Sequence, residues 1–568
     1  MTNSIREIRD ADCVLVIGSN TGESHPVISY EVVRAVRRGA TLIVIDPRKI
    51  SLTRHAFLHL RPRPGTDHAL YLGMLQVIVA NDWCDRAFIA ERTEGFGDLA
   101  ASLEPWTPEA ASAATGVPAE QIVEAARRYA WGLRRNAGGD GAAPPARGAS
   151  TILYGMGITE RSNGTELVKT LANLAMITGQ VGRPSTGVNP LRGQNNVQGG
   201  CDVGVLPNVY PGYQKVEDPA VRAKFARAWS RTRAQSASLE LPAARGLTYI
   251  EMLRAAAVGR IKALYIMGAN PVMTCPDSGL VERALRALDF LVVQEIFPTE
   301  TAQLAHVVLP AASFAEKGGT FVNTERRFQL VRPFLAPPGD ARADWQILCD
   351  LGRRLGRRLR RPLRWAYASA AEVMREIAAL CPTFGGISHE RLASGGLQWP
   401  CPTPDHPGTR FLHEGQFVRG RGRFHVTAPA PPFEPTDAEY PLAVSSGRIL
   451  YHYNGAAMSR RAGPLAWRES RAYAEIHPED AARAGVRDGQ MCQITTRRGQ
   501  IRVQARVGDT VLPGMAYVPF HFREGAANVL THADSLDQGA KTPEYKFSAG
   551  RLEAGRSERT DPKDPPSE

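Results

Sequence analysis

The sequence predicts an α/β protein of interleaved doubly wound parallel-sheet subdomains, followed by a C-terminal β-barrel domain. Two observations predict the first part. Short runs rich in β-branched residues recur along the first 435 residues, and segments with helical spacing stand between them. A third observation predicts the barrel: beyond residue 435 apolar and polar residues alternate, as they do in half-buried strands.

The first 46 residues contain the clearest β-α-β pattern. Residues 12–18 (DCVLVIG) form an apolar strand, and a segment with helical spacing then runs to Gly39, a good helix-ending residue. Residues 40–46 (ATLIVID) form a second strand, and this order implies a parallel sheet. The alternation returns at 151–159, 164–179, 262–271, 290–297 and 306–312. We therefore expect α/β domains over residues 1–435.

Residues 436–553 are expected to form the barrel domain. Residues 490–507 (QMCQITTRRGQIRVQARV) alternate around a tight turn, which predicts an antiparallel hairpin, and the short segment PEDAARAG predicts an inserted helix. The Gly, Pro and Ala-rich residues 136–148 are expected to be a solvated insertion, and the charged residues 554–568 a disordered tail.

Composition narrows the class of protein. The net charge is +12, and the Arg-rich residues 353–364 are typical of the solvated end of a helix. They carry no interleaved aromatics, which disfavours nucleic acid as a partner. The eight cysteines include no CxxC pair, so neither an iron–sulfur cluster nor a metal site is expected within this chain, and a reducing, cytoplasmic location is favoured. No apolar run is long enough to predict a membrane span, and the N-terminus lacks a signal-peptide pattern.

Five strand-end loops resemble one another: GSNTGES, DPR, GMGIT, MGANP and QEIF. Ligands of open parallel sheets bind beyond the carboxyl ends of the strands, where glycines admit phosphates and an acid suits a ribose or purine edge. Each loop alone is compatible with an ordinary turn, but five together favour an extended, nucleotide-like cofactor. No G-x-G-x-x-G follows the first strand, which disfavours a plain NAD-binding fold.

Residues 189–204 (NPLRGQNNVQGGCDVG) are too polar to pack a core. They hold one arginine, Arg192, among amides and four glycines. Buried amides need hydrogen-bond partners, so such a segment is typical of the lining of a polar cavity. A guanidinium presents paired donors to a planar anion such as a carboxylate. The residues alone leave two readings equally open, a small-anion site and an exposed arginine on a surface loop.

Several segments together resemble the molybdopterin oxidoreductase family, and within it the catalytic α subunits of formate dehydrogenases. They are HPVISYEVVRAVRRGATLIVIDPRK, ILYGMGIT, TGQVGRPSTGVNPLRGQNNVQGGCDVGVLPNVYPGYQ, YIMGANP and KTPEYKF. The resemblance runs from about residue 3 to about residue 553 and is interrupted at 136–148.

The resemblance implies two-electron oxidation of formate to CO2 at a molybdenum or tungsten ion, held by two molybdopterin guanine dinucleotides. Arg192 matches the arginine that orients formate, and Gln194 follows it toward the pterin. The other positions matched to cofactor contacts are Asn20, Glu23, Ser24, Asp46, Arg48, Gly65, Asp67, Met156, Gly157, Gly268, Asn270, Thr274, Gln294, Asp344, Arg448, His452, Asn454, Asn528, Tyr545 and Lys546.

Three residues need comment beside this pattern. Glu160 stands where the family is expected to have glutamine, and Asn270 where an acid is common. A carboxylate at 160 opposes an anionic pterin unless it is paired or protonated. His25 is interpreted as a turn residue beside Pro26.

The resemblance also implies parts that this chain does not contain. Family members begin with an iron–sulfur domain and a selenocysteine or cysteine followed by histidine, and Met1 aligns shortly after that pair. An in-frame UGA taken as a stop codon, a frameshift or a mis-assigned start would each explain this. We therefore expect the polypeptide as written to be inactive. A full-length product is expected to pass electrons through iron–sulfur centres to flavin/NAD-linked or hydrogenase subunits.

Two alternative functions remain at this point. A nitrate-reductase-like enzyme shares similar cofactor loops, and a non-catalytic structural subunit can share the fold. The stretches RGQNNVQG, YPGYQ and KTPEYK favour formate, and the retained polar loops disfavour a purely structural role.

Overall fold

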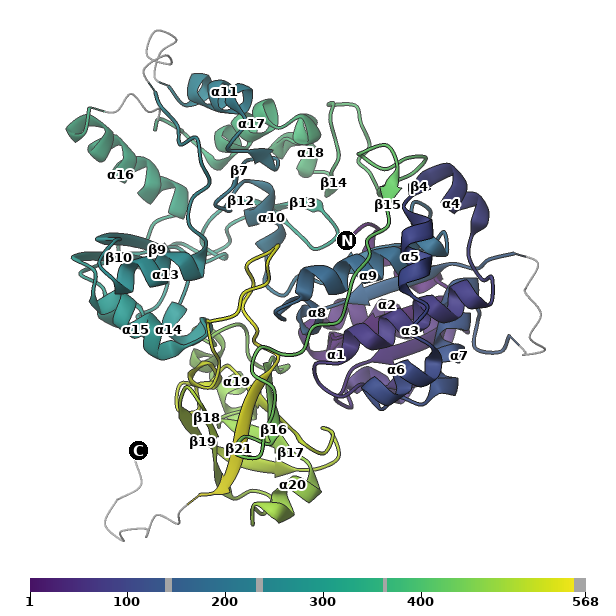
Figure 1. Cartoon of the computed structure of the whole chain (residues 1–568). Helices are drawn as coiled ribbons and strands as arrows, with labels where there is room; N and C mark the ends of the chain where they lie inside the picture. Colours follow the sequence, from purple (N-terminus) through teal and green to yellow (C-terminus); the bar gives the residue numbers. More distant parts are fainter. Residues whose placement is uncertain (138–145, 231–238, 361–364, 556–568) are drawn as a thin grey trace.

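A computed structural model describes residues 1–137, 146–230, 239–360 and 365–555. Figure 1 shows one α/β unit on the right, a second α/β region on the left and a barrel below them. Most of the predicted insertion at 136–148, the end of the Arg-rich run at 353–364 and most of the predicted tail at 554–568 lie outside the described residues.

The first sheet contains five parallel strands in the order β3-β2-β1-β5-β6. Their bounds are β1 Cys13–Ile17, β2 Thr41–Ile45, β3 Leu58–Leu60, β5 Ser150–Tyr154 and β6 Val188–Pro190. Every residue of β1, β2 and β5 is buried, as expected of apolar strands covered on both faces. The strand order reverses between β1 and β5, and this switch point is where open α/β sheets bind ligands.

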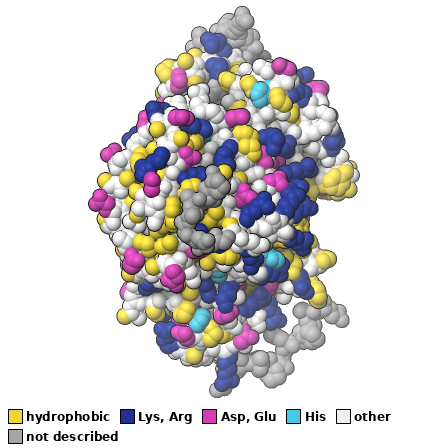
Figure 2. Space-filling model, turned by 90° about the vertical axis from the view of Figure 1, so that its right-hand side faces the viewer, with side chains coloured by type: hydrophobic (Ala, Val, Ile, Leu, Met, Phe, Trp, Pro, Cys, Tyr) yellow, Lys and Arg dark blue, Asp and Glu magenta, His cyan; other side chains and the backbone are white. Residues whose placement is uncertain are grey.

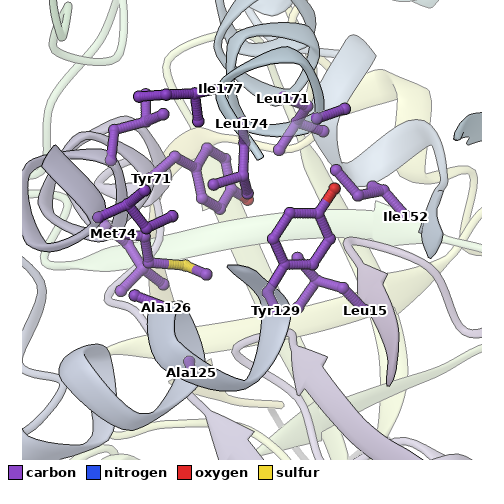
Figure 3. Close-up of a cluster of buried hydrophobic side chains, with 14 of the residues drawn as sticks. Leu15, Tyr71, Met74, Ala125, Ala126, Tyr129, Ile152, Leu171, Leu174 and Ile177 are labelled. Atoms are coloured by element: carbon purple, nitrogen blue, oxygen red, sulfur yellow. The ribbon is translucent and has the colours of Figure 1, made fainter. Parts of the chain in front are cut away.

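Helices cover both faces of this sheet, which confirms the doubly wound prediction. Figure 3 shows side chains of α3 (Asp67–Ala80), α7 (Ala119–Trp131) and α9 (Gly164–Ile177) packed on strands β1 and β5. On the opposite face α2 (Pro26–Arg37) and the 3-10 helix η1 (Ile5–Asp10) bury a second cluster, because Ile28, Val32 and Ala35 recur at helical spacing.

The remaining elements of this part of the chain are short. They are α1 Thr21–Ser24, η2 Ser51–His55, α4 Arg86–Arg92, β4 Thr93–Glu94, α5 Phe96–Ser102, α6 Pro108–Thr115, α8 Met156–Thr159 and α10 Val197–Asp202. Strand β4 pairs with the distant strand β15 (Gly422–Arg423), so the segment before the barrel returns to the first unit.

A second parallel sheet has the order β11-β10-β9. Its strands are β9 Ala263–Met267, β10 Phe290–Glu295 and β11 Val307–Pro310, and its helices are α13 Tyr249–Ala257, α14 Pro271–Thr274, α15 Ser278–Arg286 and the 3-10 helix η3 Ala302–Leu304. Helix α15 buries Val281, Ala284 and Leu285 in the core that it shares with α13 and β10. These elements match the strands and helix expected between residues 262 and 312.

An antiparallel region was not anticipated before residue 435. Strands β12 (Gly319–Val322), β13 (Arg327–Val331) and β14 (Leu397–Gln398) form a small antiparallel sheet. Helices α17 (Ala370–Leu380) and α18 (His389–Leu392) and the 3-10 helix η4 (Pro382–Phe384) pack on it. The other elements of this part of the chain are β7 Val209–Tyr210, β8 Gln214–Lys215, α11 Pro219–Trp229 and α16 Asp344–Arg358. These strands are too short and too mixed in burial to stand out in the sequence.

The C-terminal strands close into a six-stranded barrel in the order β16-β20-β17-β19-β18-β21. The strands are β16 Leu442–Gly447, β17 Tyr473–Ile476, β18 Met491–Thr496, β19 Gln500–Val507, β20 Met515–Pro519 and β21 Ser548–Ala554, with η5 Ser459–Arg461, α19 Gly463–Arg468, α20 Pro478–Arg483 and η6 Ala527–Val529 between them. The predicted β18–β19 hairpin is antiparallel, but β16–β20 and β17–β19 pair in parallel. The barrel and the antiparallel hairpin are therefore confirmed, and the two parallel pairings were not anticipated.

The surface mixes charges of both signs. Figure 2 shows Lys and Arg side chains spread among acidic and apolar ones on the face that the first unit presents. In the described part of the chain, no helix combines the length and the apolar character needed to cross a membrane.

Candidate active site between the first sheet and the barrel

A cavity of about 440 Å³ lies between the carboxyl ends of the first sheet and the barrel. Its volume is in the range of cofactor and substrate sites. The lining comes from loops after β1, β2 and β5 and from strands β16 and β20. The structure thus brings together many of the positions singled out in the sequence: Asn20, Ser24, Asp46, Arg48, Asp67, Met156, Gly157, Gln194, Thr274, Arg448, Asn454, Asn528, Tyr545 and Lys546.

Glycines form the floor of the cavity at the switch point between β1 and β5. A Cβ atom on Gly155 would lie 2.8 Å from the carbonyl oxygen of Gly18, and one on Gly157 would lie 2.7 Å from it. The Gly157 N–H instead donates to that oxygen at 3.0 Å. The two strand-end turns approach closely because neither carries a side chain there. Here the cavity is therefore lined by backbone rather than by side chains.

Asn20 enters the cavity with an unsatisfied amide. Its Nδ2 and Oδ1 atoms are buried and make no well-formed hydrogen bond to any described residue. Such orphaned polar atoms cost free energy unless a ligand or water satisfies them. Glu23, which does not line the cavity, lies nearby, and burial raises the pKa of its carboxyl while the Asn20 amide and the Arg48 charge oppose that shift. The Asn20 amide is therefore placed to form hydrogen bonds with a ligand in the cavity.

Asp46 and Arg48 follow strand β2. The Arg48 N–H donates to Asp46 Oδ1 at 2.9 Å, and burial raises the pKa of Asp46 to about 6 although that N–H and the Arg48 charge oppose the rise. The Arg48 guanidinium donates to both carboxylate oxygens of Glu475 on β17, at 2.9 and 3.1 Å. It also stacks 3.4 Å from the ring centroid of Tyr517. Arg48 therefore joins the first sheet to the barrel.

The backbone of Arg192 is held from two sides. The Arg192 N–H donates to Thr324 Oγ1 at 3.0 Å, and the Arg192 carbonyl oxygen lies 2.7 Å from His25 Nε2. A carbonyl can only accept, so His25 Nε2 carries the proton. Burial lowers the pKa of His25, which keeps this imidazole neutral. His25 lies at the junction of α1 and α2 beside Pro26, as interpreted from the sequence. It also lines the cavity, which was not anticipated from the sequence and was signalled there only by its place beyond the first strand.

The next two residues of the loop are held by the barrel. Arg448 Nη1 donates to the carbonyl oxygen of Gly193 at 2.7 Å. A Cβ atom on Gly193 would lie 2.7 Å from both terminal nitrogens of Arg448, so a side chain at this position would displace the guanidinium from its present place. Gln194 Nε2 donates to Asn454 Oδ1 at 3.0 Å. The polar segment thus gains its order from contacts with distant parts of the chain.

The guanidinium of Arg192 is half-buried and stands next to the main cavity rather than among its lining residues, which include Leu191 and Gly193. Its Nε donates to Gln198 Oε1 at 3.2 Å. Within the described residues, its Nη1 and Nη2 atoms have no hydrogen-bond partner. One edge of the guanidinium is therefore available to an anion.

Glu160 is paired. Its Oε2 lies 2.7 Å from Lys546 Nζ, and the same ammonium donates to the carbonyl oxygen of Ser446 at 2.8 Å. All three residues line the cavity. The unexpected carboxylate is therefore accompanied by a cation, which removes the electrostatic objection to an anionic ligand beside it.

A second group of predicted positions lies at the carboxyl ends of the second sheet, outside this cavity lining. Gln294 Nε2 donates to Asp344 Oδ1 at 2.6 Å, and Asn270 Nδ2 donates to Glu300 Oε2 at 2.7 Å. Gly268 follows β9. The five strand-end loops are thus divided between two sheets.

Two further predicted positions are engaged elsewhere. Both ring nitrogens of the buried His452 have partners in the barrel, Ser459 Oγ at 3.1 Å and the Glu469 carbonyl oxygen at 2.7 Å. Gly65 lies against Pro432. In the described part of the chain, no cluster of three or more His, Cys, Asp or Glu side chains is arranged to hold a metal ion.

Comparison with family models decides the class. The model of molybdopterin oxidoreductases matches residues 1–354, and that of the molybdopterin dinucleotide binding domain matches residues 442–549. The chain belongs to the molybdopterin oxidoreductase family. It is therefore an oxidoreductase with the sequence features of a molybdopterin-binding protein, and the cavity lies between its two matched regions.

Two formate dehydrogenases are similar to this molybdopterin oxidoreductase over nearly its whole length. F420-dependent formate dehydrogenase 1 subunit alpha of Methanococcus maripaludis is 45% identical over 97% of this chain and 78% of its own length. Formate dehydrogenase H of Escherichia coli is 38% identical over 97% of this chain and 74% of its own. The solved structure of acetylene hydratase from Pelobacter acetylenicus has a TM-score of 0.70 at 18% identity, over 98% of this chain and 81% of that one, which shows a common fold.

Proposed function

We propose that this chain is the catalytic portion of a formate dehydrogenase, which oxidises formate to CO2 at a molybdenum or tungsten centre held by two molybdopterin guanine dinucleotides. The observation that carries the proposal is the ordered RGQN segment: Gly193 and Gln194 line the cavity, and the adjacent Arg192 has two terminal nitrogens with no hydrogen-bond partner among the described residues. The names of the two formate dehydrogenase relatives support the same substrate.

The residues present suit a dinucleotide cofactor. The orphaned amide of Asn20 offers both a donor and an acceptor, and the glycines at the ends of β1 and β5 let a ligand approach the backbone closely. Asp46 offers a carboxylate to the N–H edge of a guanine. We assign the second dinucleotide to the group around Gln294 and Asp344 beside the second sheet.

Arg192 would bind and orient the substrate. Its Nη1 and Nη2 donors match the two oxygens of a carboxylate, and a bidentate pair leaves the C–H bond of formate pointing away from the guanidinium. The reaction releases CO2, one proton and two electrons from each formate. The metal centre, when bound, supplies the acceptor for those electrons. The segment around Arg192 supplies fixed geometry, because its peptide groups are already hydrogen-bonded.

The proposal also covers the domains of the chain and its partner subunits. We assign residues 1–435 to the molybdopterin oxidoreductase domains and residues 436–553 to the dinucleotide-binding barrel. Partner subunits carrying iron–sulfur centres and flavin or hydrogenase activity would receive the electrons, in the cytoplasm. The subunit designation of the Methanococcus relative supports a multi-subunit assembly.

The test is to purify the protein from its complete gene, anaerobically and from a host that makes the cofactor. Three quantities are measured: bound molybdenum and tungsten, guanine nucleotide released on denaturation, and formate-dependent reduction of a viologen dye. We expect bound metal, guanine nucleotide and dye reduction with formate. Metal-loaded protein that ignores formate but oxidises reduced viologen with nitrate would favour the nitrate alternative and end the formate proposal.

A further inference from the structure

The orientation of the Arg192 guanidinium depends on one amide. Arg192 Nε donates to Gln198 Oε1 at 3.2 Å, and Gln198 is buried on helix α10. This contact occupies the Nε edge of the guanidinium. The two terminal nitrogens therefore remain as the edge that can meet an anion.

The amide of Gln198 is itself oriented by Asp202, one helical turn away. Gln198 Nε2 donates to Asp202 Oδ1 at 2.7 Å. The Asp202 carboxylate is fully buried and also accepts from the Tyr213 hydroxyl at 2.8 Å and from Trp399 Nε1 at 2.7 Å. A carboxylate that receives three donors acts only as an acceptor, so the NH2 end of Gln198 must face Asp202. Its oxygen must then face Arg192.

We propose that Gln198, oriented by Asp202, is a positioning residue that presents the Nη1–Nη2 edge of Arg192 to the substrate. Two parallel N–H donors on this edge match two coplanar oxygens, so the site selects small planar oxyanions bound end-on. The inference rests on the proposed function and deepens it, because it explains how a carboxylate is held in one orientation beside the cavity.

The experiment uses Gln198→Met, which keeps the length of the side chain and removes the acceptor. Gln180→Met is the matched control, since Gln180 is also buried and accepts from an arginine, Arg183 Nη2 at 2.7 Å, outside the cavity lining. Binding is measured with sodium nitrate, a planar anion, as the concentration-dependent rise in Tm at ionic strength held constant with chloride. The KM and kcat for formate and the guanine nucleotide content are measured on the same preparations.

We expect Gln198→Met to weaken nitrate binding and to raise the KM for formate by about tenfold or more, as for loss of an oriented hydrogen bond to a charged group. The kcat should change less, because the interaction binds ground state and transition state alike. Nucleotide content should match the wild type. Gln180→Met should keep the wild-type nitrate affinity even where its Tm is lower.

A second variant tests the same inference if Gln198→Met does not fold. Asp202→Leu has a similar side-chain volume and removes the oxygen that accepts from Gln198 Nε2, so the Gln198 amide loses its fixed orientation and nitrate binding should weaken as well. The inference is overturned if either folded variant binds nitrate within twofold of the wild type, if Gln180→Met is equally impaired, or if the wild type shows no nitrate-dependent stabilisation. A wild type that binds nitrate but never oxidises formate ends the proposed function alone.

Discussion

Arg48 and Glu475 form a bidentate ion pair that joins the first sheet to the barrel across the edge of the cavity. Their side chains are only 11% and 15% exposed, and the Tyr517 ring packs on the guanidinium. The pair comes from residues 427 positions apart in the chain. It therefore couples the docking of the barrel to the conformation of the loop that follows β2.

Removing the acid of this pair should destabilise the protein. Glu475→Gln removes the carboxylate that pairs directly with the buried Arg48 guanidinium, and breaking such a buried pair typically costs about 3–5 kcal/mol. Differential scanning calorimetry should show a lower Tm. The control is Asp509→Asn, which breaks the neighbouring but solvent-exposed pair with Lys49 and should change stability by less than about 1 kcal/mol. Equal effects of the two changes would contradict a buried, coupling role for Glu475.

The Glu160–Lys546 ion pair predicts that cofactor binding depends on the net charge of these two side chains. Lys546→Met leaves an unpaired carboxylate facing the cavity, where it should repel an anionic cofactor and lower the guanine nucleotide content. The double variant Lys546→Met with Glu160→Gln restores neutrality and should recover part of that content. If the double variant holds no more nucleotide than Lys546→Met, Lys546 acts through a direct contact rather than by neutralising Glu160.

We expect His25 to affect formate binding through one hydrogen bond, which its Nε2–H donates. His25→Ala removes the hydrogen bond to the Arg192 carbonyl oxygen, and we expect the KM for formate to rise by roughly tenfold. His25→Gln places an amide N–H at a similar reach and should restore most of the affinity. Steady-state kinetics on both variants test this, with nucleotide content as the control. Equal impairment of the two variants would show that the imidazole has another role.

Arg192 itself should be needed for formate and dispensable for the cofactor. Arg192→Lys keeps the charge but loses the paired donors, so the KM for formate should rise by about tenfold to a hundredfold. Bound metal and nucleotide should stay near the wild-type amounts, because the guanidinium is not among the lining residues of the main cavity. Loss of metal from this variant would mean that Arg192 is structural.

His68 should make the fold sensitive to acid. Its ring is buried, with Nε2 3.0 Å from the hydroxyls of Thr170 and Thr427, and burial lowers its pKa to about 4. In the unfolded chain histidine titrates near 6.5. The unfolded state therefore binds more protons between these two values, and the stability due to neutral His68 is present above about pH 6.5 and is lost as the pH falls toward 4.

The measurement is Tm between pH 7.5 and 4.5 for the wild type and His68→Gln. The variant lacks the titrating group, so its Tm should fall less over this interval even if it starts lower. An unchanged pH dependence would place the acid sensitivity in other residues.

Apolar runs and their spacing were sufficient to predict both parallel sheets. In the first sheet every residue of β1 and β2 is buried, and strands buried on both faces must be apolar along their whole length. The barrel was also predictable from alternation at residues 490–507, although its parallel pairings β16–β20 and β17–β19 were not. Which strands become neighbours depends on long connections whose path local patterns do not encode. The small antiparallel sheet of β12, β13 and β14 was missed for the same reason.

For the site, the sequence alone determined that one segment is too polar for a core: a lone guanidinium in a run of amides and glycines needs hydrogen-bond partners. Only the tertiary structure decided which partners those are. His25, Gln198 and Arg448 reach Arg192 and Gly193 from helix ends and from the barrel, and Lys546 neutralises Glu160 from nearly 400 residues away. Hydrogen bonds and ion pairs act over a few ångströms, so they depend on distance in space, which the order of residues along the chain does not specify.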